Sequence, residues 1–339
     1  MKSISTFDDK LQEKGVDRLI LLKNPSEIFF LPRLSDELGH RIYVKRDDLS
    51  SIGMGGNKLR KLEYLLAEAR REGANRIITV GARQSNHARL TAYAAKMSGF
   101  EVDLVLKNSV ANSSELYRNN GNIILDELVD ARIHEIPNDH RVSEFIEKLV
   151  QDYREKGEKP YFIPVGGSNT TGGLGYARAV LEIEEQARSM DLDFSHIGVA
   201  SGSGGTHGGL LAGVAYLEKD IQIQAYNVQL DREPILEDTK IIVKEIAGLL
   251  NGQEYIDESK IHLSNEYVGE GYGLLNDETK ACIKKVAQME GMLLDPVYSG
   301  KAFTGFINDI KLGKFANSRE FLFIHTGGTP SIFAYADRF

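Results

Sequence analysis

The sequence predicts an α/β protein with mainly parallel sheets, and three observations support this fold class. Short runs rich in β-branched residues alternate with segments of helical periodicity along the chain. Many of the 33 glycines stand directly after these runs, which is where open α/β sheets place their ligand-binding loops. The chain of 339 residues is too long for one small domain, so it suggests two domains or one large one. A repeated order of strand, helix and strand is typical of a parallel sheet.

The individual strands can be placed by their composition. We expect them at residues 41–44, 76–80, 101–106, 131–136, 161–165, 196–200, 221–228 and 320–324. Amphipathic segments between these runs are expected to form helices. No internal repeat and no Pro-rich or Ser-rich linker interrupts the series, so the domain boundaries must come from the topology of the fold.

The composition limits the classes of function. Hydrophobic residues make up 42% and charged residues 27% of the chain, as in an ordinary globular protein. The net charge is -8 and the basic residues are scattered, so we expect no nucleic-acid partner. The single cysteine, Cys282, cannot form an internal disulfide, which favours a reducing cytoplasm. The charged N-terminal stretch and the lack of an apolar run of ~18 residues predict neither a signal peptide nor a membrane partner.

The first of four Gly-rich junctions is SIGMGGNK, residues 51–58. The periodicity of the segment after it predicts an amphipathic helix that begins close to Asn57, with Lys58 in its first turn. The positive end of the helix dipole, together with Arg60 and Lys61, favours a neutral amine at Lys58. A neutral amine is a nucleophile that can form a Schiff base. The alternative is a solvated surface lysine, and this junction alone favours that alternative.

The second junction is GARQSNHAR, residues 81–89, which follows a strand and opens an Ala-rich helix. Ser85 and Asn86 are residue types that cap helices, and the free backbone N–H groups behind them can hold a carboxylate. Capping and ligand contact explain these two residues equally well, so both interpretations stay open.

The third junction is SGSGGTHGG, residues 201–209, between a strand and a helix. Its small residues let the backbone approach a phosphate closely, and the helix N-terminus supplies N–H donors and positive potential. The lysine of a P-loop is absent and the spacing departs from GxGxxG, so neither a nucleoside triphosphate nor a dinucleotide is favoured. A flexible loop is the alternative, but the strand-to-helix setting favours phosphate.

The fourth junction is HTGGTPS, residues 325–331. Thr329 and Pro330 read as an N-cap and the first helical residue, and Thr326 lies just beyond a strand end, where such sheets meet their ligands. Upstream, DPVYSGKAFTG places Tyr298 and Ser299 in a turn before another helix, although a tyrosine there is more often a packing residue. The eight histidines form no HExxH pattern and no GxSxG occurs, so we expect no metal site and no serine hydrolase.

Taken together, these segments resemble the fold-type II pyridoxal-phosphate enzymes, the tryptophan synthase β-like group. Within that group they are most similar to the D-cysteine desulfhydrase and 1-aminocyclopropane-1-carboxylate (ACC) deaminase family. The resemblance covers nearly the whole chain, in the order LPRLSDELG, IYVKRDDLS, GGNKLRKLEYLLAEA, GARQSNHARLTAYAA, IPVGGSNTTGGLGY, SGSGGTHGG, LLDPVYSGKAFTG and HTGGTPSIFAY. Each segment alone is weak, but their ordered combination is specific and overturns the surface interpretation of Lys58.

The resemblance implies the cofactor, pyridoxal 5'-phosphate, and a role for each matching residue. Lys58 corresponds to the lysine that binds the cofactor covalently, and Asn86 to the partner of the pyridoxal 3-hydroxyl. Ser85, Asn86 and His87 correspond to the loop that receives the substrate carboxylate. The phosphate cradle would consist of Gly202, Ser203, Gly204, Gly205 and Thr206. Tyr298 is similar to the tyrosine that lies against the pyridine ring, and Tyr272 to a second tyrosine near the substrate.

The resemblance also implies an architecture and an assembly. It predicts two open, mainly parallel, twisted sheets flanked by helices. A large cofactor domain would be built from residues 1–58 and 173–339, with a smaller inserted α/β domain at 59–172. Family members are commonly homodimers, so we expect the same here.

Two positions help to choose the reaction that the resemblance implies. Deaminases of the family typically carry Glu where Ser299 stands and Leu where Thr326 stands, whereas desulfhydrases carry hydroxyl residues. A hydroxyl can donate to an unprotonated pyridine nitrogen, which gives a weaker electron sink than a carboxylate partner would. A weaker sink suffices to eliminate thiolate, so we expect D-cysteine to be converted to pyruvate, hydrogen sulfide and ammonia.

Three other functions stay open at this stage. Within enzymes, the runner-up is ring-opening deamination of ACC, and relatives that act on L-cysteate or another β-substituted amino acid are a further possibility. From another class, the chain could be a binding or sensor protein for a phosphorylated ligand that lost turnover. The presence of Lys58, Ser85 and Tyr298 argues against this last interpretation.

Overall fold

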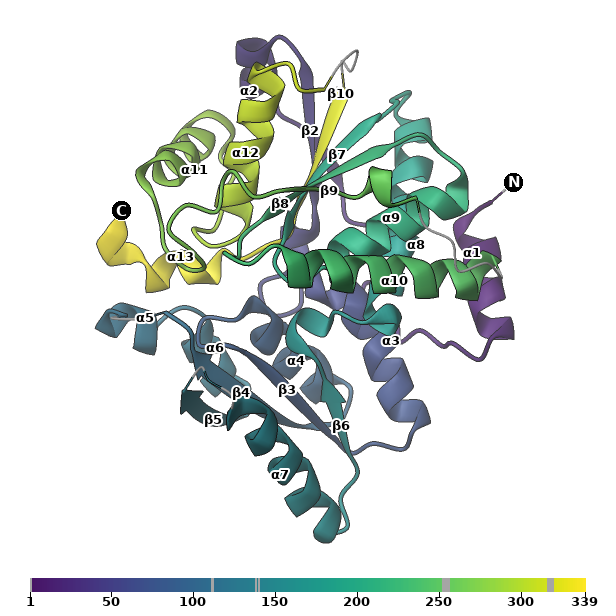
Figure 1. The fold of residues 1–339 in the computed structure, drawn as a ribbon, viewed down its shortest axis with the longest axis vertical. Coiled ribbons are helices and arrows are strands. Elements are labelled where there is room, and N and C mark those ends of the chain that lie inside the picture. The colour runs from purple at the N-terminus through teal and green to yellow at the C-terminus, as the bar shows by residue number, and fades with distance from the viewer. Residues whose placement is uncertain (1, 111–112, 138, 140, 252–256, 316–319) are drawn as a thin grey trace.

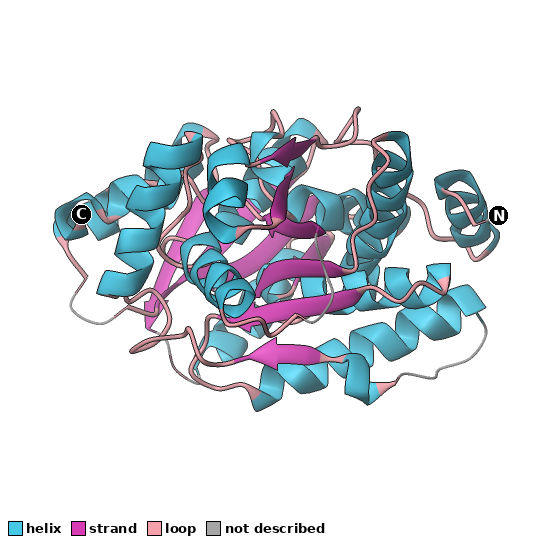
Figure 2. Ribbon diagram, turned by 90° about the horizontal axis from the view of Figure 1, so that it is seen from above, coloured by secondary structure: helices cyan, strands magenta, loops and turns pink. Residues whose placement is uncertain are grey.

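The computed structural model describes residues 2–110, 113–137, 139, 141–251, 257–315 and 320–339. Within these residues the chain forms two sheets, each flanked by helices, with the larger sheet above the smaller one in the view of Figure 1. Figure 2 shows helices on both sides of the strands. The predicted α/β class with two open, mainly parallel sheets is therefore confirmed.

The larger sheet holds the two ends of the chain together. Among the described residues its strand order is β1-β2-β10-β7-β8-β9. The strands are β1 (Ile28–Phe30), β2 (Arg41–Arg46), β7 (His196–Ser201), β8 (Gln222–Asn227), β9 (His262–Ser264) and β10 (Glu320–His325). Among the described strand pairs of this sheet only β1–β2 is antiparallel, so the carboxyl ends of β2, β10, β7 and β8 share one edge.

The smaller sheet is parallel throughout its described pairs, with the order β5-β4-β3-β6. Its strands are β3 (Arg76–Ala82), β4 (Glu101–Asn108), β5 (Arg132–Pro137) and β6 (Pro160–Ile163). All seven residues of β3 are buried, as a central strand covered on both faces requires.

The helices divide between the two sheets. Those around the larger sheet are α1 (Ile4–Glu13), α2 (Pro32–Leu38), α9 (Gly205–Leu217), α10 (Glu233–Asn251), α11 (Asp277–Glu290), α12 (Ser299–Lys311) and α13 (Pro330–Ala334). Those around the smaller sheet are α4 (Asn86–Met97), α5 (Glu115–Asn119), α6 (Asn122–Leu128) and α7 (Arg141–Glu155). The chain passes between the sheets through α3 (Lys58–Arg71) and α8 (Thr170–Ser189), which pack on each other. None of the described helices is both long and apolar enough to cross a membrane.

Each of the eight predicted strands is present, and the ends differ for physical reasons. The run expected at 161–165 stops at Ile163, because Pro164 has no N–H to donate and a turn with Gly166 at φ 68° follows. The sequence analysis missed β1 and β9. Each has three residues, which is too short for an alternating pattern to be read.

Side chains on the two faces of the larger sheet form two separate cores. Ile197 and Val199 of β7 point to one core with α8, α9 and α10, whereas Phe321 and Phe323 of β10 pack against α11 and α12 in the other. Strand residues two apart share a face, so this division follows from the alternation along each strand.

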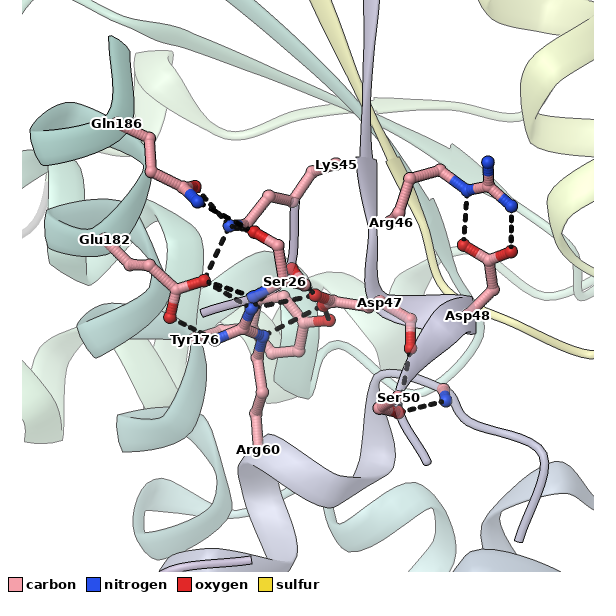
Figure 3. Close-up of polar contacts among 11 residues, drawn as sticks. Ser26, Lys45, Arg46, Asp47, Asp48, Ser50, Arg60, Tyr176, Glu182 and Gln186 are labelled. Atoms are coloured by element: carbon pink, nitrogen blue, oxygen red, sulfur yellow. Dashed lines mark hydrogen bonds and ion pairs between the residues drawn. The ribbon is translucent and has the colours of Figure 1, made fainter. Parts of the chain in front are cut away.

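A buried ion network joins the first turn of α3 to the larger sheet and to α8 (Figure 3). The Arg60 guanidinium donates to both Asp47 oxygens and both Glu182 oxygens at 2.8–3.0 Å. Lys45 Nζ also donates to Glu182, at 2.6 Å. The neighbouring cations outweigh burial and lower the pKa of Asp47 and Glu182 to about 2. Two cations therefore face two carboxylates, and the charges balance.

We predict that Glu182→Ala lowers the free energy of unfolding by about 3–5 kcal/mol, because it leaves two buried cations without one of their carboxylates. The matched control is Glu237→Ala, which removes an exposed glutamate paired with Lys240 on α10 and should cost less than about 1 kcal/mol. Urea unfolding followed by circular dichroism measures both. Equal losses in the two variants would contradict the prediction.

Candidate active site

A cavity of about 200 Å³ lies where the carboxyl ends of strands from both sheets meet. Residues from the ends of β3, β4, β7 and β10 line it, which is the edge where open α/β sheets bind ligands. All the site residues expected from the sequence line this one cavity: Lys58, Ser85, Asn86, His87, Gly202, Ser203, Gly204, Gly205, Thr206, Tyr272, Tyr298 and Thr326.

Lys58 is the first residue of α3, as the periodicity predicted, and Asn57 is the N-cap. The Asn57 side chain donates to Thr206 Oγ1 at 3.0 Å, so it ties the start of α3 to the start of α9. Enclosure by the protein lowers the pKa of the Lys58 amine to about 8. Among the described residues no side chain or carbonyl forms a hydrogen bond or ion pair with Lys58 Nζ, so this amine faces the cavity without a partner.

Ser85 is the N-cap of α4, and its Oγ accepts a hydrogen bond from Ala88 N at 3.1 Å. Its hydroxyl proton is then available to donate into the cavity that it lines. The backbone N–H groups of Asn86 and His87 belong to the first turn, which leaves them without carbonyl partners inside the helix. Capping and ligand contact, the two interpretations left open for Ser85, are therefore compatible.

His87 lines the cavity, but its ring is held by threonines. Its Nε2 lies 2.8 Å from Thr79 Oγ1, whose hydroxyl donates to Ile163 O, so Nε2 carries the proton. Burial lowers the pKa of His87 well below its ordinary value, and Lys58 and Lys61 lower it further. The ring is therefore neutral at physiological pH.

The Gly-rich loop after β7 turns sharply into α9. Gly204 takes the left-handed conformation, with φ 72°, and caps the helix without a side-chain hydrogen bond. A Cβ on Gly205 would clash with the Ser168 hydroxyl and would lie 2.6 Å from Lys61 Nζ, so a larger residue would have to displace these side chains. The exposed N–H groups and the dipole of α9 make this loop an anion-binding position.

Two tyrosines also line the cavity. Tyr298 OH and Tyr272 OH are 2.8 Å apart, and burial raises the pKa of both phenols. Both therefore stay protonated at neutral pH. A Cβ on Gly202 would lie 3.1 Å from the Tyr298 ring, so a glycine there leaves the ring space beside the loop.

Thr326 and Ser299 have different surroundings. Thr326 lines the cavity, and its carbonyl accepts from Asn57 N at 3.1 Å. Ser299 is fully buried outside the cavity lining, and its hydroxyl donates to Asp295 Oδ1 at 2.6 Å. That proton is already used within the 295–299 turn.

Sequence reasoning missed several residues that line the same cavity. They are Asn57, Lys107, Ser109 and Gln229. Lys107 and Ser109 stand at the end of β4, so the rule that ligands lie beyond carboxyl ends of strands could have found them. From the sequence, Lys61 is expected only to add positive charge near Lys58. Its Nζ donates to Gly166 O and Ser168 Oγ at 3.1 Å, beside the Gly-rich loop.

Known proteins similar to this chain are numerous. Residues 20–327 match the family model described as pyridoxal-phosphate dependent enzyme. A D-cysteine desulfhydrase of Klebsiella pneumoniae (strain 342) is 42% identical over 318 residues, which cover 94% of this chain and 96% of that protein. A D-cysteine desulfhydrase of Salmonella newport (strain SL254) is 42% identical over 320 residues, with the same coverage.

Solved structures of related proteins are similar to this chain as well. A crystal structure described as an ACC deaminase homologue superposes with a TM-score of 0.89 and 37% identity, covering 98% of this chain and 97% of its own. A serine racemase from Dictyostelium discoideum superposes with a TM-score of 0.62 at 15% identity, covering 96% and 98%, which indicates a shared fold. With a family model that spans most of its length, the chain belongs to the pyridoxal-phosphate dependent enzymes.

Proposed function

We propose that the protein is a pyridoxal-phosphate dependent carbon–sulfur lyase that converts D-cysteine and water to pyruvate, hydrogen sulfide and ammonia. One observation carries this proposal: the partnerless amine of Lys58 shares a single small cavity with the Gly-rich start of α9. The names of the 42% identical relatives support D-cysteine as the substrate.

The residues present fit both the aldehyde and the phosphate of the cofactor. An aldehyde needs an amine with a substantial neutral fraction, and a pKa of about 8 leaves Lys58 with about a tenth of its molecules neutral at pH 7, against less than about a thousandth for an ordinary lysine. A phosphate needs N–H donors with no Cβ in the way. Gly204 and Gly205 keep the backbone open, and the first-turn N–H groups of α9 beyond Gly205, whose own N–H donates to Ser203 O, can meet the phosphate. Burial lowers the pKa of Lys61, which lies beside this loop, well below its ordinary value, and a bound phosphate would favour its charged form.

In the proposed reaction the bound cofactor supplies an electron sink for the charge that develops at the substrate Cα. Lys58 Nζ acts as the base that takes the Cα proton. The Ser85 hydroxyl and the N–H groups at the start of α4 hold the substrate carboxylate. The hydroxyls of Tyr272 and Tyr298 stay protonated and do not serve as bases at neutral pH; one donates to the other, which leaves one proton to donate in the cavity.

The second candidate function is ring-opening deamination of ACC. The structural similarity to an ACC deaminase homologue favours it. Thr326 argues against it, because this hydroxyl lines the cavity where deaminases of the family carry leucine. Ser299 is weaker evidence against the deaminase function, because its hydroxyl donates to Asp295 and not into the cavity.

We also infer the organisation around this site. Residues 1–58 and 173–339 would form the cofactor domain and residues 59–172 the inserted domain, because each sheet draws its strands from one of these sets. A second copy of the chain would cover the hollow lined by Leu49 and Met97, which are exposed apolar residues. The single cysteine favours the cytoplasm as the location.

We predict that borohydride reduction of the pyridoxal-phosphate-loaded protein leaves a pyridoxyl group on the peptide that contains Lys58. In short exposures of the apoprotein, the yield should rise with pH and reach half its maximum near pH 8, because the neutral amine is the reacting form. Peptide mass spectrometry measures both results. Labelling of another lysine, or a midpoint above about pH 10 as for an ordinary lysine, would contradict this assignment.

We predict that D-cysteine yields equal amounts of sulfide and pyruvate, whereas ACC yields no 2-oxobutanoate. Lys58→Ala should lower kcat at least about a hundredfold, because it removes both the cofactor tether and the base. Lys148→Ala, on the exposed surface of α7, is the matched control and should keep full activity. The appearance of 2-oxobutanoate from ACC without sulfide from D-cysteine would make the deaminase reading the correct one.

We predict a homodimer in sedimentation experiments, with twice the chain mass of 37.7 kDa. Met97→Glu should shift the equilibrium toward the monomer, because it buries a charge in the proposed interface. Leu312→Glu, at an exposed apolar position at the end of α12, is the control and should leave the mass unchanged. A wild-type protein that sediments as a monomer would refute the assembly.

A further inference from the structure

Behind Asn86 lies a buried network of polar side chains that the proposed mechanism does not use. Arg89 of α4 and Asn122 of α6 are both completely buried. Asn122 Nδ2 donates to Asn86 Oδ1 at 3.0 Å and to Gln84 O at 2.9 Å, while Arg89 Nη1 donates to Asn122 Oδ1 at 2.7 Å. Arg89 Nη1 also lies 3.4 Å from Asn86 Oδ1.

The neighbours of this network fix which way each amide points. A guanidinium only donates, so the Asn122 atom at 2.7 Å from Arg89 must be the oxygen. A backbone carbonyl only accepts, so the Asn122 atom near Gln84 O must be the nitrogen. That nitrogen also contacts Asn86, whose facing atom must therefore accept and be the oxygen.

Because Asn86 Oδ1 faces Asn122, the Asn86 Nδ2 group faces the cavity. Asn86 lines that cavity, and no described residue accepts a hydrogen bond from its Nδ2. A group that meets Asn86 from inside the cavity must therefore be an acceptor. If Asn122, with the longer contact from Arg89, did not hold the oxygen, the amide could turn over and present an acceptor instead, since the two ends differ little in shape.

Arg89 extends the network to the loop before Lys58. Its Nη2 donates to Gly55 O at 2.9 Å, three residues ahead of the lysine. Asp126 of α6, buried and with neither carboxylate oxygen hydrogen-bonded in the described structure, lies close enough to affect the charge of Arg89. One guanidinium thus contacts both the Asn122–Asn86 pair and the segment that carries the covalent anchor.

We propose that Asn122 and Arg89 are positioning residues that hold the Asn86 amide with its N–H groups toward the ring hydroxyl oxygen of the cofactor, and so keep that oxygen unprotonated. The proposal rests on the proposed function only in needing pyridoxal phosphate to bind. Asn122 and Arg89 do not line the cavity, but through Asn86 they would determine the protonation state of the bound ring. A hydrogen bond donated to an oxygen favours the charged form of that oxygen.

The test is a pH titration of the visible absorption of the bound cofactor in Asn122→Asp. An aspartate keeps the size of the side chain and its contact with Arg89, but it cannot donate to Asn86. We expect the titration midpoint to rise by about one pH unit or more, because the donor to the ring oxygen is lost. Asn120→Asp is the matched control, since its Oδ1 only accepts from Gly121 N, and its midpoint should equal that of the wild type.

A shifted midpoint has to come from the position of Asn86 and not from another titrating group or from unfolding. Around the cavity or behind the network lie the ionisable groups Lys58, Lys61, His87, Lys107, Tyr272, Tyr298, Arg89, Tyr93, Asp126 and Asp295, and both variants keep all of them. Asn122→Ala removes the same donor without adding a charge, so it should also raise the midpoint. It replaces Asn122→Asp in the comparison if that variant fails to fold.

A double-mutant cycle with Asn86→Ala gives the decisive result. If Asn122 acts through Asn86, then Asn86→Ala/Asn122→Asp has the same midpoint as Asn86→Ala alone. Additive shifts, or an Asn122→Asp midpoint equal to that of Asn120→Asp, would overturn the proposal while leaving the lyase assignment intact. A wild-type protein that binds no pyridoxal phosphate would instead refute the proposed function itself.

Discussion

The position of Lys58 depends on the buried charges around Arg60. Arg60 follows Lys58 by two residues and is held between Asp47, directly after β2, and Glu182 on α8 (Figure 3). A buried guanidinium without these carboxylates would carry a large desolvation cost, so the first turn of α3 has one favourable place between the sheets. Since α3 is one of the two segments that pass between the sheets, the same ion network sets how the two halves of the cavity meet.

Within the cavity, electrostatics favour an anion at both ends. The N-termini of α4 and α9 point their N–H groups into it, and Lys58, Lys61 and Lys107 stand on or next to its walls. The described lining residues include no carboxylate. Burial lowers the pKa of all three lysines, and a cofactor phosphate or a substrate carboxylate would favour their charged forms, so binding of anionic ligands also stabilises the folded cavity.

Local sequence signals predicted the helix starts at Lys58 and Asn86 and the loop at Gly204, because caps and periodicity act over a few residues. They could not predict the Arg60–Glu182 pair, whose members lie 122 positions apart. Local signals did not indicate Tyr272 either, because its partners in the cavity lie far away along the chain; only the family resemblance pointed to this residue. The surroundings of Ser299 were also out of reach, since the choice of Asp295 as its acceptor depends on the geometry of a turn.

Burial acts in opposite directions on the groups that line the cavity, and this decides which of them can be a base. It lowers the pKa of Lys58, but it raises the pKa of Tyr272 and Tyr298. The His87 ring is neutral, but its contacts with Thr79 and Thr91 direct its nitrogens away from proton transfer in the cavity. A single low-dielectric enclosure therefore weakens the basicity of the lysine but leaves more of it neutral, with a free lone pair, and it keeps both phenols protonated. The division of roles follows from burial acting on groups of opposite charge type, so it needs no further specialised residue.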